Sequence, residues 1–131
     1  MTIFSKIIAG QIPCYKVAEN ENFIAFLDIF PVQKGHVLVV PKMEVDKLFD
    51  LPDTILAGLL PFAQPIAKAL ETLFACNRVN IITVGLEVPH AHVHLIPTNT
   101  THDVNLLNPK IAFSPAEFEA IQQQIIAAIA K

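Results

Sequence analysis

The chain has 131 residues, of which 53% are hydrophobic and 16% are charged, and its formal net charge is −3 at pH 7. This length suits a single domain, residues 1–131, and no apolar run approaches the roughly 18 residues that span a bilayer, so no membrane partner is expected. Lys and Arg form no basic stripe, which argues against polymeric nucleic acid as a partner. Cys14 and Cys76 lack a Cys-x-x-Cys pairing, so we expect no disulfide framework, no thiolate zinc site and a cytoplasmic location.

The N-terminal third is predicted to contain a short helix, a hairpin and a buried strand. Apolar residues in the segment Thr2–Gly10 follow helical spacing, and the glycine is placed to end the turn. Residues 15–17 and 23–27 are β-prone and are separated by turn-forming residues, which predicts a hairpin. The apolar run His36–Pro41 stops at a proline and is typical of a buried strand.

Residues 52–74 are predicted to be helical, because apolar side chains recur there at helical spacing. The stripe consists of Leu56, Leu59, Leu60, Ala63, Ala67, Leu70 and Leu73. Pro61 and Pro65 each remove a backbone donor from this helix. We therefore expect a kink, or two helices that meet near Pro61.

The C-terminal half is predicted to add two strands and a final helix. The strands are expected at 78–84 and 90–96, on either side of a short connection. The last helix is expected over 115–129, because Ser114, a following proline and Glu117 form a capping box. Five strands that do not alternate regularly with helices indicate an α+β fold with a mainly antiparallel sheet.

Three histidines, His90, His92 and His94, recur at every second residue with apolar residues between them. On a strand this period places all three imidazoles on one face. A row of imidazoles can supply a neutral nucleophile, a proton donor and partial positive charge at pH 7, all of which are useful for phosphoryl chemistry.

Two other interpretations of this row remain open at this point. One is a half-buried strand whose polar face is rich in histidine by chance. The other is a metal site, because alternate histidines on a strand can bind zinc, with Glu87, His36 or His102 as a further ligand.

The segments IFSKIIAGQIP, FLDIFPVQKGHVLVVPK and HAHVHLIP occur in this order and resemble the histidine triad (HIT) family over most of the chain. The resemblance implies a HIT-like fold, with a five-stranded sheet, a long central helix and a C-terminal helix. It also implies a hydrolase or transferase that acts at the α-phosphate of purine nucleotide conjugates, such as nucleoside phosphoramidates or dinucleoside polyphosphates. Such relatives act without a cofactor and form homodimers, and both properties are expected here.

The resemblance also implies roles for individual histidines. His92 would attack phosphorus and carry a transient nucleotidyl group, which divides one difficult step into two. His94 and His36 would complete the cluster around the phosphate. His90 would help to set the geometry of the strand, although a purely structural role is as plausible for it.

The resemblance implies a nucleoside site around Asp28, whose carboxylate would accept hydrogen bonds from the ribose hydroxyls. The apolar residues implied around the base are Ile29, Phe4, Ile7, Ile12, Phe26 and Leu38. On the sequence alone, a place in the hydrophobic core is the better explanation for each of these apolar residues.

The chain departs from the family pattern just before the triad, where residues 83–89 are compressed. Thr83 stands near the position of a family asparagine, and Leu86 stands at that of a glutamine. Thr83, Gly85 and Glu87 are nevertheless predicted to line the phosphate site, although an ionised Glu87 would repel phosphate. These departures leave open a catalytically weak nucleotide-binding or scaffold protein. Thr2-Ile3-Phe4-Ser5 replaces a Cys-x-x-Cys zinc element of some relatives, so no structural zinc is implied.

Overall fold

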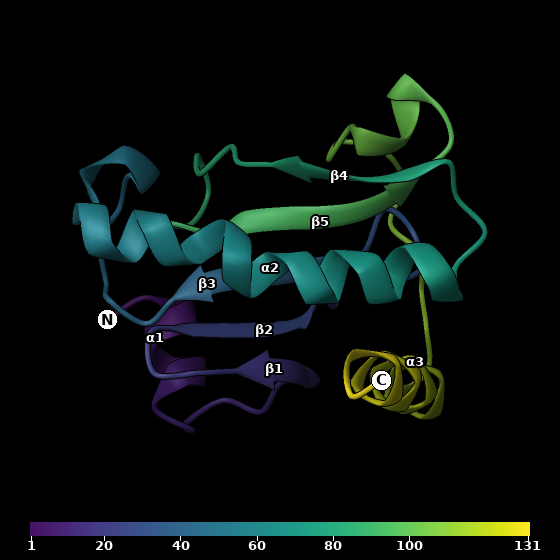
Figure 1. Ribbon diagram of the computed structural model, residues 1–131, viewed down its shortest axis with the longest axis horizontal. Coiled ribbons are helices and arrows are strands. Elements are labelled where there is room, and N and C mark those ends of the chain that lie inside the picture. The colour runs from purple at the N-terminus through teal and green to yellow at the C-terminus, as the bar shows by residue number, and fades with distance from the viewer.

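The computed structural model describes residues 1–131 and is built on a five-stranded antiparallel sheet in the order β1-β2-β3-β5-β4 (Figure 1). The strands are β1 (Lys16–Glu19), β2 (Phe23–Leu27), β3 (Val37–Pro41), β4 (Arg78–Ile82) and β5 (Val93–Thr98). The helices are α1 (Ile3–Ile8), α2 (Asp53–Leu73) and α3 (Pro115–Ile129), with short 3₁₀ turns η1 (Leu48–Asp50) and η2 (Thr101–Val104). This is the α+β arrangement that the sequence predicts.

The two faces of the sheet carry separate apolar clusters, because side chains alternate along each strand. Phe23, Ala25 and Leu27 of β2 face α2 and α3 and belong to the larger cluster. Ile24 and Phe26 point to the opposite face and pack against α1. Figure 1 shows α2 crossing one face of the sheet and the much shorter α1 behind it. The α1 face is therefore the less covered of the two.

Helix α2 is continuous from Asp53 to Leu73, so the expectation of two helices meeting near Pro61 is wrong. Pro61 and Pro65 are both exposed. The carbonyls deprived of an i+4 donor by Pro61 and Pro65 belong to the exposed residues Ala57 and Pro61, where water can satisfy them. Leu60 is 60% exposed and does not join the buried stripe, contrary to expectation.

Strand β5 is shorter than predicted at its start, because it begins at Val93 rather than at residue 90. Before Val93, backbone N–H groups donate hydrogen bonds to carbonyls of loop residues instead of those of β3. The N–H of His90 donates to Val88 over 2.8 Å, and the N–H of Ala91 donates to Val45 over 2.7 Å. Strand β4 also ends early, at Ile82.

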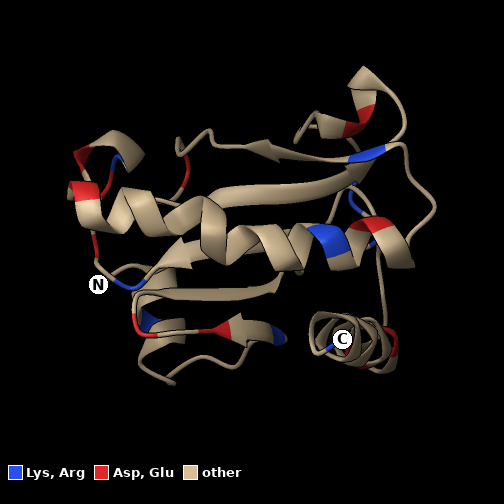
Figure 2. Cartoon of the chain, viewed as in Figure 1, with Lys and Arg blue, Asp and Glu red and all other residues tan.

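The ends of α1 and α3 follow the predicted signals. The hydroxyl of Ser114 accepts from the N–H of Glu117, whose carboxylate accepts in return from the N–H of Ser114. Gly10 follows α1 with a φ of +78°, a conformation that glycine adopts readily. Charged residues are spread over several elements, and the basic ones form no stripe along the chain (Figure 2). None of the helices combines the length and the apolarity needed to cross a membrane.

Candidate functional site

The histidine triad lies on the α1 side of the sheet, beside its central strands. In the sheet register His94 is paired with Leu38 of β3 and with Ile82 of β4. The ring centroids of His92 and His94 are 5.2 Å apart. The ring of Phe4 packs edge-on against both His92 and His90, at 4.9 and 5.8 Å. The three imidazoles thus lie on one side, as predicted, although His90 and His92 precede the regular strand.

The ring of His92 is oriented by its own backbone. Nδ1 of His92 lies 2.7 Å from the carbonyl oxygen of His90, which can only accept, so Nδ1 carries the proton. In the neutral ring, Nε2 then keeps a free lone pair. Burial is the main cause that lowers the pKa of His92 below its usual value, which favours this neutral form.

The protonation of His36 and His94 is fixed by a chain of hydrogen bonds. The N–H of Val32 donates to Nδ1 of His36 over 3.2 Å, so the proton of the neutral ring is on Nε2. That Nε2–H donates to Nδ1 of His94 over 2.9 Å, so the neutral ring of His94 carries its own proton on Nε2. Burial lowers the pKa of each ring to about 4, so both are neutral at pH 7.

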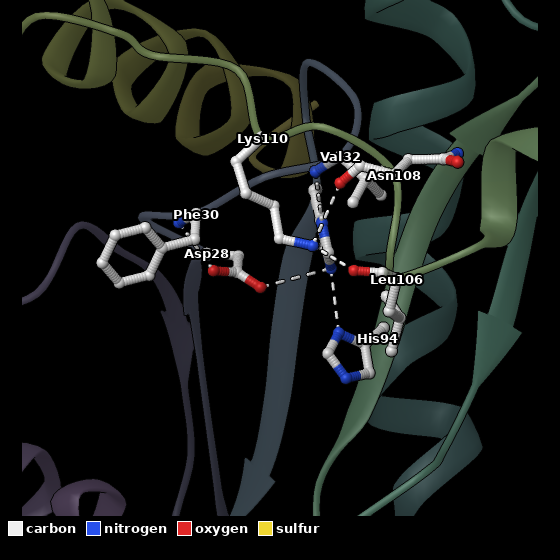
Figure 3. A network of polar contacts seen from close by, with 8 residues as sticks. Asp28, Phe30, Val32, His94, Leu106, Asn108 and Lys110 are labelled. Carbon is white, nitrogen blue, oxygen red and sulfur yellow. Dashed lines mark hydrogen bonds and ion pairs between the residues drawn. The ribbon is translucent and has the colours of Figure 1, made fainter. Parts of the chain in front are cut away.

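Two further polar groups lie close to the His36–His94 pair (Figure 3). Oδ1 of Asp28 accepts from the N–H of Phe30 over 2.8 Å, while Oδ2 lies 3.5 Å from Nε2 of His36. Lys110 donates to the carbonyls of Leu106 and Asn108, and its charge contributes to the lowered pKa of His36 and His94. Sequence reasoning identified Asp28 but missed Lys110, which stands in a polar loop without any pattern around it.

The apolar residues predicted around the base are only partly brought together. Phe4, Phe26 and Leu38 are buried in one cluster with Ile24 and Val40. Ile7 is half-buried against this cluster, Ile12 is half-buried outside it, and Ile29 is 54% exposed beside Asp28. Phe4 also contacts the triad, because its ring packs edge-on against those of His90 and His92.

These features together, a His-x-His-x-His row, a fourth buried histidine and an aspartate at the end of β2, agree with a comparison against protein families. The model of the HIT domain matches residues 9–101 of the chain. The chain belongs to the HIT domain family.

Individual relatives of this HIT domain support the same assignment. The chain is 37% identical to an adenosine 5′-monophosphoramidase of Schizosaccharomyces pombe over 94% of both chains. It is 42% identical to an adenosine 5′-monophosphoramidase of Saccharomyces cerevisiae, covering 72% of this chain and 61% of that protein.

Solved structures share the HIT fold over almost the whole chain. A Hit-like protein from Bartonella henselae has a TM-score of 0.84 at 30% identity, covering 97% of this chain and 95% of the other. A zinc-bound histidine triad family protein from Mycobacterium smegmatis has a TM-score of 0.80 at 30% identity, covering 98% and 92%.

The compressed segment 83–89 of this HIT domain lies beside the triad but offers few groups to a ligand. The hydroxyl of Thr83 donates to the carbonyl of His92 over 2.8 Å, so its hydrogen is already used in a bond to the backbone. Gly85 has a φ of +69°, and Leu86 is 88% exposed. Glu87 is exposed and its carboxylate has no protein partner, which leaves its negative charge in solvent.

A metal ion does not fit this HIT site well. Asp28, His36 and His94 place ligand atoms within 4.8 Å of one another, whereas Glu87 and His102 are not part of that group. A metal at Nε2 of His36 would need a lone pair there. The N–H of Val32 holds the lone pair on Nδ1 instead. Binding would therefore require that a buried backbone hydrogen bond be broken.

Proposed function

We propose that this HIT domain hydrolyses purine nucleoside 5′-phosphoramidates to a nucleoside monophosphate and an amine through a nucleotidyl intermediate on His92. The observation that supports it best is the 2.7 Å hydrogen bond from Nδ1 of His92 to the carbonyl of His90. This bond leaves Nε2 available as a neutral nucleophile. The relatives named as adenosine 5′-monophosphoramidases support the substrate class.

The proposed first step forms a bond from Nε2 of His92 to phosphorus and breaks the phosphorus–nitrogen bond of the substrate. The amine leaves with a proton taken from solvent. The His92 ring becomes positively charged, and the carbonyl of His90 stabilises that charge through Nδ1–H. The Nε2–H of His94 donates to an equatorial phosphate oxygen, where negative charge accumulates.

In the second step a water molecule attacks phosphorus and the bond to Nε2 of His92 breaks. The water proton passes to solvent, and His92 returns to its neutral form. The net reaction consumes one water and yields the monophosphate and the amine. Asp28 is proposed to hold the ribose hydroxyls, with the cluster around Phe4 beside the base.

Phosphoramidates are preferred over dinucleoside polyphosphates as substrates because of the segment ahead of the triad. Glu87 places an unpaired carboxylate there, which would repel the additional phosphates of a polyphosphate leaving group. The same segment supports the second candidate, a nucleotide-binding protein with weak catalysis, because Leu86 provides no side-chain donor.

The direct test is mass spectrometry of the protein quenched during reaction with adenosine 5′-phosphoramidate. We expect an added AMP group on His92, and loss of both adduct and turnover in His92→Ala. His102→Ala is the control, because His102 is exposed on η2. Full turnover by His92→Ala would refute the mechanism. AMP binding by calorimetry without turnover or adduct would favour the weak nucleotide-binding protein.

We propose that no metal cofactor takes part, because the Val32–His36 hydrogen bond opposes coordination at the histidine pair. Turnover of the purified protein should be unchanged after treatment with a chelator. Loss of turnover that is restored by zinc would support the metal-dependent alternative instead.

We also propose a homodimer formed through β4 and α2. Strand β4 is an edge of the sheet, and such edges pair readily with another strand. Ile81 of β4 is 48% exposed and lines an apolar groove with the exposed Leu60 of α2. Ile81→Lys should give a monomer in sedimentation analysis. Ile126→Lys on α3, which packs near β1 at the other edge of the sheet, should leave the dimer intact.

A further inference from the structure

A cluster of hydrogen bonds outside the phosphate site joins the N-terminal helix to the first histidine of the triad. The hydroxyl oxygen of Thr2 lies 2.8 Å from Nδ1 of His90, and that of Ser5 lies 3.4 Å from it. The carboxylate of Glu44 accepts from the hydroxyl of Ser5 and from the N–H of Thr2, the latter over 3.0 Å. Thr2 and His90 are 88 positions apart in the chain.

The direction of each hydrogen bond around His90 follows from its partners. Nε2 of His90 lies 2.8 Å from the carbonyl oxygen of Pro41, so Nε2 carries the proton and Nδ1 must accept. The hydroxyl oxygen of Thr2 accepts from the N–H of Ser5, and its one hydrogen has two acceptors within reach, Nδ1 of His90 at 2.8 Å and the hydroxyl oxygen of Ser5 at 3.2 Å. The contact with Nδ1 is the shorter, and we assign the hydrogen to it. The side chain of His90 is completely buried, and both of its nitrogens are satisfied.

The backbone of His90 is the link to the nucleophile. Its carbonyl accepts the Nδ1–H of His92. The next N–H, that of Ala91, donates to the carbonyl of Val45 over 2.7 Å. The orientation of the peptide between His90 and Ala91 is thus fixed by a side chain on one side and by a loop carbonyl on the other.

We propose that Thr2 is a positioning residue for the reaction: by donating to Nδ1 of His90 it fixes the ring and the carbonyl that hold His92 in its nucleophilic tautomer. The inference rests on the proposed function. It adds a requirement for the hydroxyl hydrogen of Thr2, which the capping of α1 does not use. A helix N-cap needs only an oxygen that accepts from the N–H of Ser5.

Loss of this donor would leave the buried Nδ1 with only the hydroxyl of Ser5, which lies 3.4 Å away and already donates to Glu44. His90 could then move its proton to Nδ1, which removes the donor from the carbonyl of Pro41. That change displaces the His90 carbonyl, which holds the Nδ1–H of His92.

Two matched pairs of variants distinguish the two functions of the Thr2 hydroxyl, donation to His90 and capping of α1. Thr2→Val removes the hydroxyl at nearly constant shape, and Thr2→Ser keeps it. Thr2→Asn and Thr2→Asp both cap helices well, but only the amide can donate to His90. Each variant is measured with Met1 in place, and Thr54→Val, an exposed threonine of α2 without a side-chain hydrogen bond, controls for the substitution itself.

Two readouts are needed, steady-state turnover of adenosine 5′-phosphoramidate and the ¹⁵N NMR spectrum of the histidine rings. We expect Thr2→Val and Thr2→Asp to lower kcat about tenfold or more at nearly constant KM, within the roughly hundredfold cost of a 1 Å misplacement. Thr2→Ser and Thr2→Asn should restore most of the activity. The NMR spectrum of Thr2→Asp should show a proton on Nδ1 of His90.

The proposal is overturned if Thr2→Asp keeps the kcat of Thr2→Asn, or if the protonation of His90 and His92 is the same in both. Should Thr2→Val fail to fold, the Asn and Asp pair still decides the question, because both retain the cap. The NMR result does not depend on turnover. A failure of the proposed function would therefore appear as an inactive parent protein with the expected His90 shifts.

Discussion

Nε2 of His36 lies 2.9 Å from Nδ1 of His94, and this bond decides which nitrogen of His94 carries a proton. His36 is the donor in this bond because the N–H of Val32 donates to Nδ1 of His36, which leaves the ring proton on Nε2. His94 therefore presents an N–H from Nε2 while His92 presents a lone pair from its own Nε2. The two neighbouring rings are held in opposite tautomers, because Nδ1 of His92 faces a carbonyl that accepts and Nδ1 of His94 faces a ring N–H that donates.

Replacement of His36 should impair catalysis through His94. His36→Leu removes the donor to His94 and allows its proton to move to Nδ1, so the Nε2–H is lost. We expect kcat for adenosine 5′-phosphoramidate to fall about 10²-fold, the lower range for a lost acid–base group. His36→Gln offers an amide donor and should recover part of the loss. Equal rates in the two variants would contradict this role, provided that thermal unfolding shows both to be folded.

The free energy of unfolding should decrease when the pH is lowered from 6.5 to about 4. His36 and His94 bind protons near 6.5 when exposed but only near pH 4 in the folded protein, because burial lowers their pKa. The unfolded chain binds more protons between these pH values, so acidification favours unfolding. We expect a loss on the order of 3 kcal/mol for each of the two rings, measured by urea unfolding at several pH values. His36→Gln should show a shallower slope over the same interval.

Asp28→Asn should weaken substrate binding more than it slows the chemical step. The amide keeps one acceptor oxygen but loses the charge, so we expect KM to rise about tenfold with a small change in kcat. The control is a 2′,3′-dideoxy substrate, which has no ribose hydroxyls to donate. For that substrate the variant and the parent should have similar KM values, and a tenfold difference there would argue against ribose binding.

Gly35→Ala should destabilise the fold at the turn that precedes β3. A Cβ at this position would lie 2.6 Å from the ring of Phe74, and the φ of +87° is unfavourable for alanine. We expect a loss of about 2 to 4 kcal/mol in chemical unfolding. Gly10→Ala has a similar φ of +78° but no atom within 4 Å, so it isolates the backbone effect, at about 1 to 2 kcal/mol. Equal losses would show that contact with Phe74 is unimportant.

Local patterns predicted the parts of the structure that depend on neighbouring residues. The capping box at Ser114 and the alternation of the triad are properties of a few consecutive residues, and both appear in the structure. The prediction of two helices meeting near Pro61 was wrong because the two prolines do not themselves show whether the carbonyls they leave without a donor face water. That exposure decides whether a lost hydrogen bond is costly.

The protonation of the site could not be predicted from the sequence. It depends on the N–H of Val32 and on the carbonyl of Pro41, which are backbone groups present at every residue type. The contact of Thr2 with His90 depends on how α1 docks onto the sheet. The sequence singled out the side chains that we propose to react, and the fold supplies the hydrogen-bond partners that set their protonation.

His94 is paired with Leu38 and Ile82 within the sheet, whereas residues 83–89 lie outside it. Insertions at these two places should therefore have different consequences in evolution. One residue inserted between His92 and His94 would turn one of them toward α2, because a shift of one position exchanges the faces of a strand. Residues 83–89 precede β5 and can lengthen or shorten without that penalty. Substrate preference can therefore diverge through the length of this segment while the reactive row is inherited intact.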